Sequence, residues 1–283
     1  MKNIVLALLC LFSLPFAGCK TNGYYGLSTH YNPQDSLINF KDYPLVEHHA
    51  RPYFVTGNTF VIFGATHTRN PEDFQMALIE EIWNDLQPTI ALVEGKAGML
   101  PPIGDPVKAM GENGKVTRLA NKNNVPVYSW DLSKQELAKQ LQPQFTKEQI
   151  ALAQILNPYF SNLRFGKPAS PEKFIKEYLH RAEYVGLGKE LKSAADVDRV
   201  WKKYFPAELD WRNVSDEYGL PGYLAHMMAA TNDLRNQKLI AVTKELTSKG
   251  ERVFIICGSS HAVCVAPAFK PKFDFEEVTA QVE

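Results

Sequence analysis

Four short apolar runs, separated by segments with helical spacing, predict the architecture of this chain. Each run stops abruptly at a glycine or a polar residue, and strands are expected at 61–63, 89–93, 125–130 and 252–257. Runs that are apolar at every position are typical of strands buried on both faces of a parallel sheet. Helical patterns separate the first three strands, and this β-α-β-α-β order predicts a parallel sheet with right-handed crossovers.

The first of these helices is expected to begin directly after the first strand. Asn70-Pro71-Glu72-Asp73 offers an asparagine cap, a proline at the first helical position and acids in the first turn. The apolar stripe that follows ends near Trp83, and a second helix is expected over 116–123. A helix beginning at Asn70 would also place backbone N–H groups close to His67, where they would suit an anionic group.

A long helical stretch then interrupts the alternation. Helix-start signals recur through residues 133–221, including two capping-box matches, Ser133 with Glu136 and Thr146 with Gln149. A longer helix is expected from Pro221-Gly222 to about Lys249. We therefore predict an α/β fold: a small, mostly parallel sheet flanked by helices, with a large helical insertion before the last core strand. The insertion is rich in aromatic residues, which favours a helical core of its own; the alternative is a lid whose aromatic wall receives an apolar ligand.

The predicted organisation has four parts. Residues 1–18 form a lipoprotein signal peptide, 19–56 a tether and irregular lead-in, 57–132 with 222–283 the α/β core, and 133–221 the helical insertion or cap. Residues 273–279 are expected to add an edge strand to the core.

The N-terminus predicts export and a lipid anchor. A positively charged start is followed by 13 apolar residues, 4–16, which is too short to span a bilayer but right for a signal peptide. Ala17-Gly18-Cys19 then resembles the bacterial lipobox, in which the cysteine thiol carries diacylglycerol. Lys20 after the cysteine indicates retention in the outer membrane, facing the periplasm, in a Gram-negative host. The alternative is a plain secretory signal with an incidental Cys19.

Composition narrows the class of protein. Hydrophobic residues make up 45% and charged residues 22%, which is ordinary globular usage and excludes a disordered chain. Lys+Arg and Asp+Glu both number 31, so the basic excess expected of a nucleic-acid-binding domain is absent. Beyond the signal peptide only Cys257 and Cys264 remain; one bridge between them is possible, but two buried thiols are favoured.

Histidines and carboxylates gather where the predicted strands end. Gly64-Ala65-Thr66-His67 follows the first strand and Gly258-Ser259-Ser260-His261 the last, while Glu94 and Asp131 end the two strands between them. Ligands of open parallel sheets bind beyond the carboxyl ends of the strands. Two imidazoles and two carboxylates at one edge can hold a divalent metal, or form a general base with an orienting acid.

With Arg235-Asn236 on the long helix, the paired Gly-x-x-His motifs and Glu94 resemble the TraB/TIKI/GumN family. This family is related to the erythromycin esterase-like and ChaN-like haem-binding proteins. The resemblance covers roughly residues 57–140 and 222–265 and implies an α/β core. For the TIKI branch it implies a metal-dependent peptidase active outside the cytoplasm. Two features depart from the pattern: Ala262-Val263-Cys264-Val265 follows the last motif, and Arg212-Asn213 offers a competing pair.

Carried over by position, the resemblance implies a site made of His67, Glu94, Arg235 and His261, with Asn236 beside them. Asp131 joins this site on its strand position alone. We expect a secreted, lipid-anchored hydrolase of peptide or amide bonds, in which His67, Glu94 and His261 bind a divalent metal. Asp131 would be a fourth ligand or the general base, and Arg235 would stabilise the oxyanion.

Two alternatives stay open on the same residues. One is a non-catalytic, ChaN-like haem-binding lipoprotein with a tyrosine or histidine axial ligand. The other is a metal-independent esterase with His67 or His261 as the base. The expected partners are a membrane, through the lipid anchor, and a peptide or small-molecule substrate, and no nucleic acid. The sequence leaves the substrate, the metal and the oligomeric state open.

Overall fold

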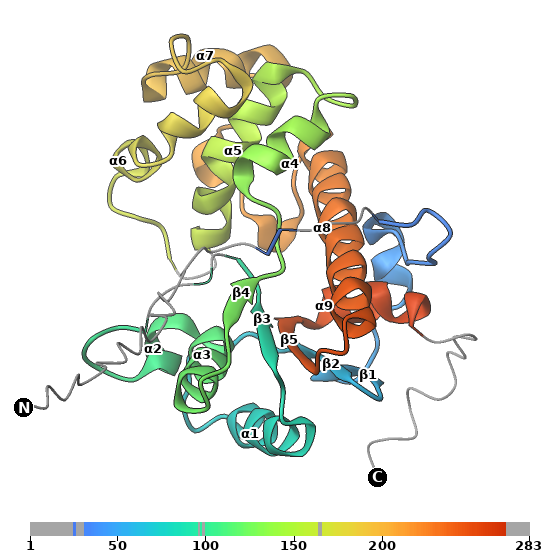
Figure 1. Ribbon diagram of the computed structural model, residues 1–283. Coiled ribbons are helices and arrows are strands. Elements are labelled where there is room, and N and C mark those ends of the chain that lie inside the picture. Colours follow the sequence, from blue (N-terminus) through green and yellow to red (C-terminus); the bar gives the residue numbers. More distant parts are fainter. Residues whose placement is uncertain (1–24, 27–30, 96, 98–99, 164–165, 270–283) are drawn as a thin grey trace, which may run out of the picture.

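The computed structural model describes residues 25–26, 31–95, 97, 100–163 and 166–269 (Figure 1). The predicted signal peptide, the lipidation site Cys19 and the edge strand expected at 273–279 lie outside these residues, so they remain predictions.

The core is a five-stranded sheet with the strand order β1-β2-β5-β3-β4. Its strands are β1 (Tyr53–Gly57), β2 (Phe60–Ala65), β3 (Ile90–Val93), β4 (Val127–Ser129) and β5 (Val253–Gly258). Strands β2, β5, β3 and β4 run parallel, and β1 pairs antiparallel with β2. The α/β class and the mostly parallel sheet are thus confirmed, with each predicted strand found within a few residues of its expected bounds.

Strand β1 was missed, because its segment was assigned to the irregular lead-in. Only Tyr53 and Val55 of this strand are buried, and its other residues are partly or fully exposed. This alternation is that of an edge strand with one solvated face. Two buried positions are too short a signal to separate from the polar, turn-rich sequence before it.

Helices cover both faces of the sheet. On one face α1 (Phe74–Leu86), α2 (Pro106–Met110) and α3 (Glu112–Lys122) bury side chains such as Phe63 and Ile256. On the other face α8 (Tyr223–Ser248) and α9 (Ser259–Val265) bury Ile62 and Ile255, followed by η6 (Ala266–Ala268). The two layers are visible on opposite sides of the strands in Figure 1. Neighbouring strand residues therefore point to opposite cores, as continuous apolar runs predict.

The predicted helix start at Asn70 is wrong. Helix α1 begins at Phe74, and Asp73 is its N-cap, accepting a hydrogen bond of 3.0 Å from the backbone N–H of Gln75. The Asn70 side chain instead accepts from the N–H of Glu72 at 3.1 Å. An asparagine whose side chain accepts from the backbone two residues on stabilises a turn instead of a helix. The helix therefore begins only after the next capping residue, Asp73. The loop after His67 is consequently longer than expected.

The insertion forms a helical cap. It contains α4 (Lys134–Leu141), α5 (Lys147–Asn162), α6 (Pro171–Lys176) and α7 (Ala194–Tyr204), with 3₁₀ turns η3 (Leu179–Val185), η4 (Trp211–Asn213) and η5 (Asp216–Tyr218). Both predicted capping boxes are present, at the starts of α4 and α5. The large aromatic side chains, Tyr159, Phe160, Trp201 and Trp211 among them, are buried inside the cap. Most of the aromatic content therefore forms the cap's own core.

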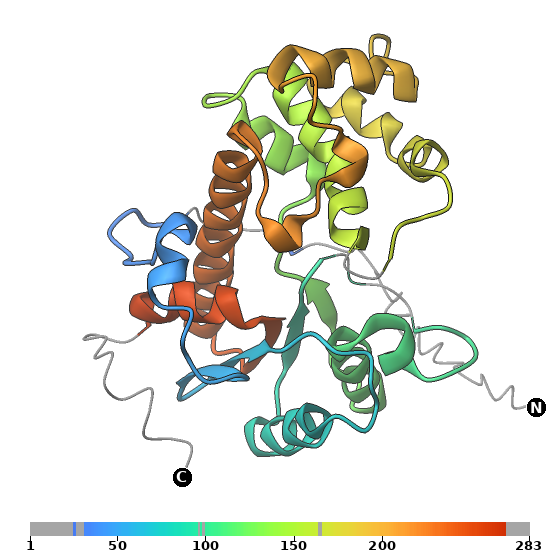
Figure 2. The same cartoon turned by 180° about the vertical axis from the view of Figure 1, so that it is seen from behind.

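Helix α8 joins the cap to the sheet. Its first turns bury Leu224 and Met227 in the cap core, and its later turns bury Leu239 and Ile240 against the sheet (Figure 1). The lead-in also packs on this region: η1 (Phe40–Leu45) lies beside α8 and α9 in both views (Figure 2). The backbone N–H of Phe40 donates to Asp233 at 2.6 Å.

The remaining expectations concern membrane-spanning segments and the two cysteines of the core. In the described part of the chain, no helix is long and apolar enough to cross a membrane. Cys257 and Cys264 are both buried and unbridged, as favoured from the sequence. Burial raises the pKa of the Cys264 thiol to about 12, so this thiol is protonated near neutral pH.

Candidate functional site

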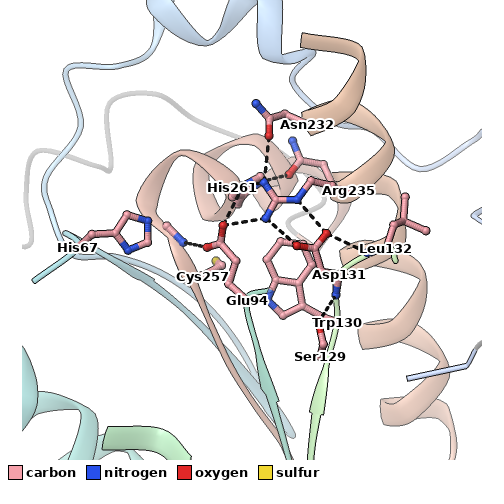
Figure 3. A network of polar contacts seen from close by, with 12 residues as sticks. His67, Glu94, Ser129, Trp130, Asp131, Leu132, Asn232, Arg235, Cys257 and His261 are labelled. Atoms are coloured by element: carbon pink, nitrogen blue, oxygen red, sulfur yellow. Dashed lines mark hydrogen bonds and ion pairs between the residues drawn. The ribbon is translucent and has the colours of Figure 1, made fainter. Parts of the chain in front are cut away.

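Arg235, on α8, is the centre of the site (Figure 3). Its Nε and one Nη2 N–H donate to the two carboxylate oxygens of Asp131 at 2.8 and 2.9 Å. Nη2 also donates to Glu94 at 2.7 Å, and Nη1 contacts Asn232 at 3.1 Å and His261 Nε2 at 3.0 Å. A guanidinium has five N–H groups, and here each has a protein partner. Arg235 therefore links the residues that follow β3, β4 and β5 to helix α8.

Each carboxylate is supplied by a strand end. Glu94 follows β3 and Asp131 lies two residues beyond β4, as their positions in the sequence predict. Burial alone would raise the pKa of the Glu94 carboxyl, but the charge and hydrogen bond of Arg235, together with the two nearby histidines, outweigh burial and hold the pKa at about 2. The two carboxylates in turn raise the pKa of Arg235 above its ordinary value. Glu94 is ionised throughout the neutral range.

Trp130 forms the apolar floor under this cluster. Its indole N–H donates to the carbonyl of Ile256 at 3.0 Å, and the Arg235 guanidinium lies 5.3 Å from its ring centre. The His261 ring meets the same indole edge to face at 5.4 Å. A cation over an indole in a buried setting is stabilised by the ring quadrupole. Trp130 thus packs against the guanidinium of Arg235, while the carboxylates accept its N–H groups.

His261 is buried and bonded at both ring nitrogens. Its Nδ1 lies 2.7 Å from the amide oxygen of Asn236, and its Nε2 faces Arg235. The Asn236 oxygen can only accept, so Nδ1 carries the proton and Nε2 is the acceptor. Burial, together with the Arg235 charge, lowers the pKa of His261 to about 4. His261 is neutral at neutral pH, and both its nitrogens are committed within the protein.

His67 lies at the other end of the cluster, on the loop after β2, and it differs from His261 in exposure. Its side chain is 65% exposed, and Nδ1 lies 3.5 Å from a carboxylate oxygen of Glu112, which is buried. The other Glu112 oxygen accepts the backbone N–H of Thr68, which fixes the acid beneath the loop. Glu112 was not predicted from the sequence, because it begins α3 and follows no strand.

The glycine of the second Gly-x-x-His motif makes room for His67. A side chain built on Gly258 would place its Cβ only 2.9 Å from His67 Nε2 and 3.8 Å from Glu94 Oε2. The backbone N–H of Gly258 donates to that same oxygen at 2.8 Å. His67 Nε2 therefore points toward the Glu94 carboxylate over the glycine, as Figure 3 shows. The two motif histidines approach the same carboxylate from different sides.

Other candidate residues lie elsewhere. Arg212, the competing arginine, pairs with Asp198, Glu172 and Asp210 inside the cap. His49, a further histidine that lies within the lead-in, contacts the Tyr43 hydroxyl at 2.9 Å. The sequence-based choice of the Arg235 pair over the Arg212 pair agrees with this placement.

A cavity of about 330 Å³ opens above the cluster, between the sheet edge and the cap. Glu94, Arg235 and His261 line one end of it. The rest is lined by side chains of the cap and of the first half of α8, which include Lys134 and Phe160. The cap therefore shapes the space in which a ligand would meet the strand ends.

The side chains, as they stand, do not fit the predicted metal site. A cation held by His67, Glu94 and His261 would need the lone pair of His261 Nε2 and a Glu94 oxygen, and both accept from Arg235. Within the described residues, no three His, Cys, Asp or Glu side chains are grouped to hold a metal ion. Metal dependence stays a prediction, and it requires Arg235 to move.

Haem fits no better in this arrangement. A haem axial ligand would be a tyrosine or a histidine with an available nitrogen. Among the described residues that line the cavity, no tyrosine occurs, and the one histidine, His261, is bonded at both nitrogens.

Comparison of the chain with protein-family models, curated proteins and solved structures finds no match in any of the three. The TraB/TIKI/GumN resemblance therefore rests on the motif residues alone.

The buried state of His261 predicts that the protein loses stability in mild acid. Its pKa is about 4 when folded and 6.5 ordinarily, so below pH 6.5 the unfolded chain binds the proton more readily. We expect the free energy of unfolding to fall by about 2 kcal/mol between pH 7 and pH 5, measured by urea denaturation. Glu94 adds a further loss only below its ordinary pKa of 4.5.

The control is the His261→Gln variant, compared with the wild type at both pH values. His49, whose pKa is also lowered by burial, contributes with the same sign in both proteins. The difference between the two proteins therefore isolates His261, and equal pH dependence would contradict a buried neutral imidazole.

Proposed function

We propose that this chain is a hydrolase of ester or amide bonds that uses His67 as general base. The observation that carries the proposal is the contrast between the two motif histidines. His67 is exposed, with Nδ1 toward the buried Glu112 carboxylate, whereas His261 is committed at both nitrogens. A histidine oriented by an acid through one nitrogen can take a proton at the other.

In the proposed reaction His67 Nε2 accepts a proton from water as the water oxygen bonds to the substrate carbonyl carbon. The tetrahedral intermediate then collapses, the C–O or C–N bond breaks, and His67 returns the proton to the leaving alcohol or amine. Glu112 holds the imidazole in one tautomer. The charges of Glu112 and Glu94 stabilise the imidazolium while it carries the proton. Glu112 lies 3.5 Å from His67 Nδ1, and Glu94 lies on the Nε2 side of the ring, across Gly258.

Arg235 acts here as a positioning residue. Because its five N–H groups all have protein partners, it has none to offer an oxyanion without breaking one of them. Its contribution is to keep Glu94 ionised and aimed at the gap beside Gly258. The predicted export and lipid anchor at Cys19 are part of the same proposal, which places the reaction in the cell envelope.

The test is an assay of the purified chain against a panel of alkyl esters, aryl esters and N-acyl amides, before and after exhaustive chelation. Hydrolysis that persists in chelator supports the proposal. Hydrolysis lost in chelator and restored by a divalent ion would establish the metal-dependent mechanism predicted from the sequence instead. No hydrolysis, together with a Soret band on adding haem, would place the protein in the haem-binding class.

Gly258→Ala is expected to lower hydrolysis without unfolding the protein. The added methyl would meet the tip of the exposed His67 side chain, which can rotate away, and Gly258 has φ −66°, a conformation that alanine adopts. We expect kcat/KM to fall by about tenfold or more, since displacing a catalytic group by about 1 Å is costly. The midpoint of thermal unfolding should stay close to that of the wild type.

Gly64→Ala is the matched contrast, in the first Gly-x-x-His motif. Its Cβ would lie 2.6 Å from Ala262 Cβ and 2.9 Å from the Ser259 backbone, neither of which can rotate away. We therefore expect Gly64→Ala to lower the midpoint of thermal unfolding, whereas Gly258→Ala lowers activity and stays folded. An equally active Gly258→Ala protein would argue against a role for His67 at this position.

A further inference from the structure

Lys134 is a partly buried cation that the proposed chemistry does not use. It is the first residue of α4, and it lines the cavity together with Glu94 and Arg235. Within the described part of the chain, it makes no hydrogen bond or ion pair at contact distance. A lysine that is largely removed from water and has no anionic partner is costly to keep charged. Its ammonium group is therefore available to a ligand in the cavity.

The acids nearest to Lys134 are already engaged. Glu94 and Asp131 both accept from Arg235, so neither is free to turn toward the lysine without losing that bond. Asp216, across the cavity, accepts from the Ser161 hydroxyl at 2.7 Å. Arg181, the other cation of the lining, donates to the carbonyl of Gln154 at 2.9 Å. Burial lowers the pKa of Lys134, and the nearby Arg235 and Arg181 charges act in the same direction, against the opposing charges of Asp131 and Glu94.

Two helices that line the cavity, α4 and α8, each carry a charged side chain near the strand ends and aliphatic side chains farther along. On α4, Lys134 is followed at helical spacing by Leu137 and Leu141, which also line the cavity. On α8 the same order runs backward along the chain, from Arg235 at the sheet edge to Met227 and Leu224 in the cap. Charged groups line the cavity at the strand ends, and the cap contributes the aliphatic side chains of α4 together with Arg181 and Asp216.

We propose that Lys134 binds the carboxylate of an acidic amphiphile whose aliphatic chain lies between Leu137 and Leu141 of α4 and the leucine and methionines of α8. The proposal rests on the proposed function in one respect, because it makes such a molecule the substrate. The scissile bond would lie between chain and carboxylate, near Glu94, as in an N-acyl amino acid or a half-ester. The aliphatic lining supplies affinity for the chain, and the lysine selects the charge.

The experiment measures binding of ligands that carry no cleavable bond, by titration calorimetry on the purified full-length chain. The probes are sodium octanoate, 1-octanol and sodium acetate. The variants are Lys134→Gln, Lys134→Arg and, as the matched control on the same helix, Lys139→Gln, whose lysine is exposed. Thermal unfolding confirms that each variant is folded, and Lys134→Arg keeps the charge if Lys134→Gln does not fold.

We expect octanoate to bind the wild type at least about tenfold more tightly than 1-octanol or acetate. Only octanoate has both a carboxylate for Lys134 and an aliphatic chain for the leucines and methionines. Lys134→Gln should weaken octanoate binding about tenfold, with little effect in Lys134→Arg or Lys139→Gln. Octanoate binding that is absent, or is unchanged in Lys134→Gln, would overturn the proposal. So would equal binding of octanoate and 1-octanol. Because no probe is hydrolysed, these outcomes are independent of whether His67 is a catalytic base.

Discussion

Replacing His67 with glutamine is expected to lower kcat/KM for the best ester or amide substrate by about 10³-fold, within the range for loss of a general base. Glutamine keeps much of the size and polarity of the side chain but cannot take a proton from water. Because the His67 side chain is 65% exposed, the variant should fold with the stability of the wild type. The measurement is the initial rate of hydrolysis in chelator, with thermal unfolding recorded alongside.

His226→Gln is the matched control. This histidine is exposed on α8, so its replacement should leave kcat/KM unchanged. Glu112→Gln separates orientation from proton transfer. Without the Glu112 carboxylate the imidazole is no longer oriented through Nδ1, so the maximal rate should drop, but by less than in His67→Gln. A His67→Gln enzyme with the wild-type rate would rule out His67 as the base, whatever the Glu112 variant does.

The strand-end residues illustrate what the sequence could predict. Glu94, Asp131 and His261 converge because parallel strands end at one edge of a sheet, which is a property of topology and needs no detailed packing. The strands themselves could be predicted because their segments are mostly apolar and are bounded by glycine or polar residues. Arg235 lies at the strand ends, as its motif predicts. That all five of its N–H groups have protein partners could not be predicted, because it depends on how closely α8 packs against the sheet edge.

The residues that sequence analysis missed depend on local backbone geometry. Glu112 reaches His67 because Gly111, at φ +61°, brings the start of α3 against the Thr68 carbonyl. Nothing in the hydrophobic pattern marks a carboxylate at the junction of two short helices. Lys134 was missed for a similar reason, since it lies inside a clear capping box and is indistinguishable in sequence from a solvated lysine in a first helical turn.

Arg235→Met is expected to cost the largest share of stability of any single change at the site. The substitution keeps the length and apolar contacts of the side chain but leaves Glu94 and Asp131 as neighbouring carboxylates without a cation. Their side chains are only 22% and 7% exposed. Removing one partner from a buried ion pair typically costs about 3–5 kcal/mol, because the remaining charge is neither solvated nor neutralised. Chemical denaturation at pH 7 measures the loss.

Two further variants separate charge from shape. Arg212→Met removes an arginine with a similar number of acidic partners, but those partners are 33–46% exposed, so the cost should be about 1 kcal/mol. Combining Arg235→Met with Glu94→Gln and Asp131→Asn removes the unpaired charges and should recover much of the stability, since uncharged groups are cheaper to bury. Recovery of folding without recovery of hydrolysis would show that Arg235 stabilises the very carboxylate that the reaction needs. An Arg235→Met protein as stable as the wild type would instead mean that the cluster is open to water. In that case burial could not lower the pKa of His261, and Arg235 could not hold down the pKa of Glu94.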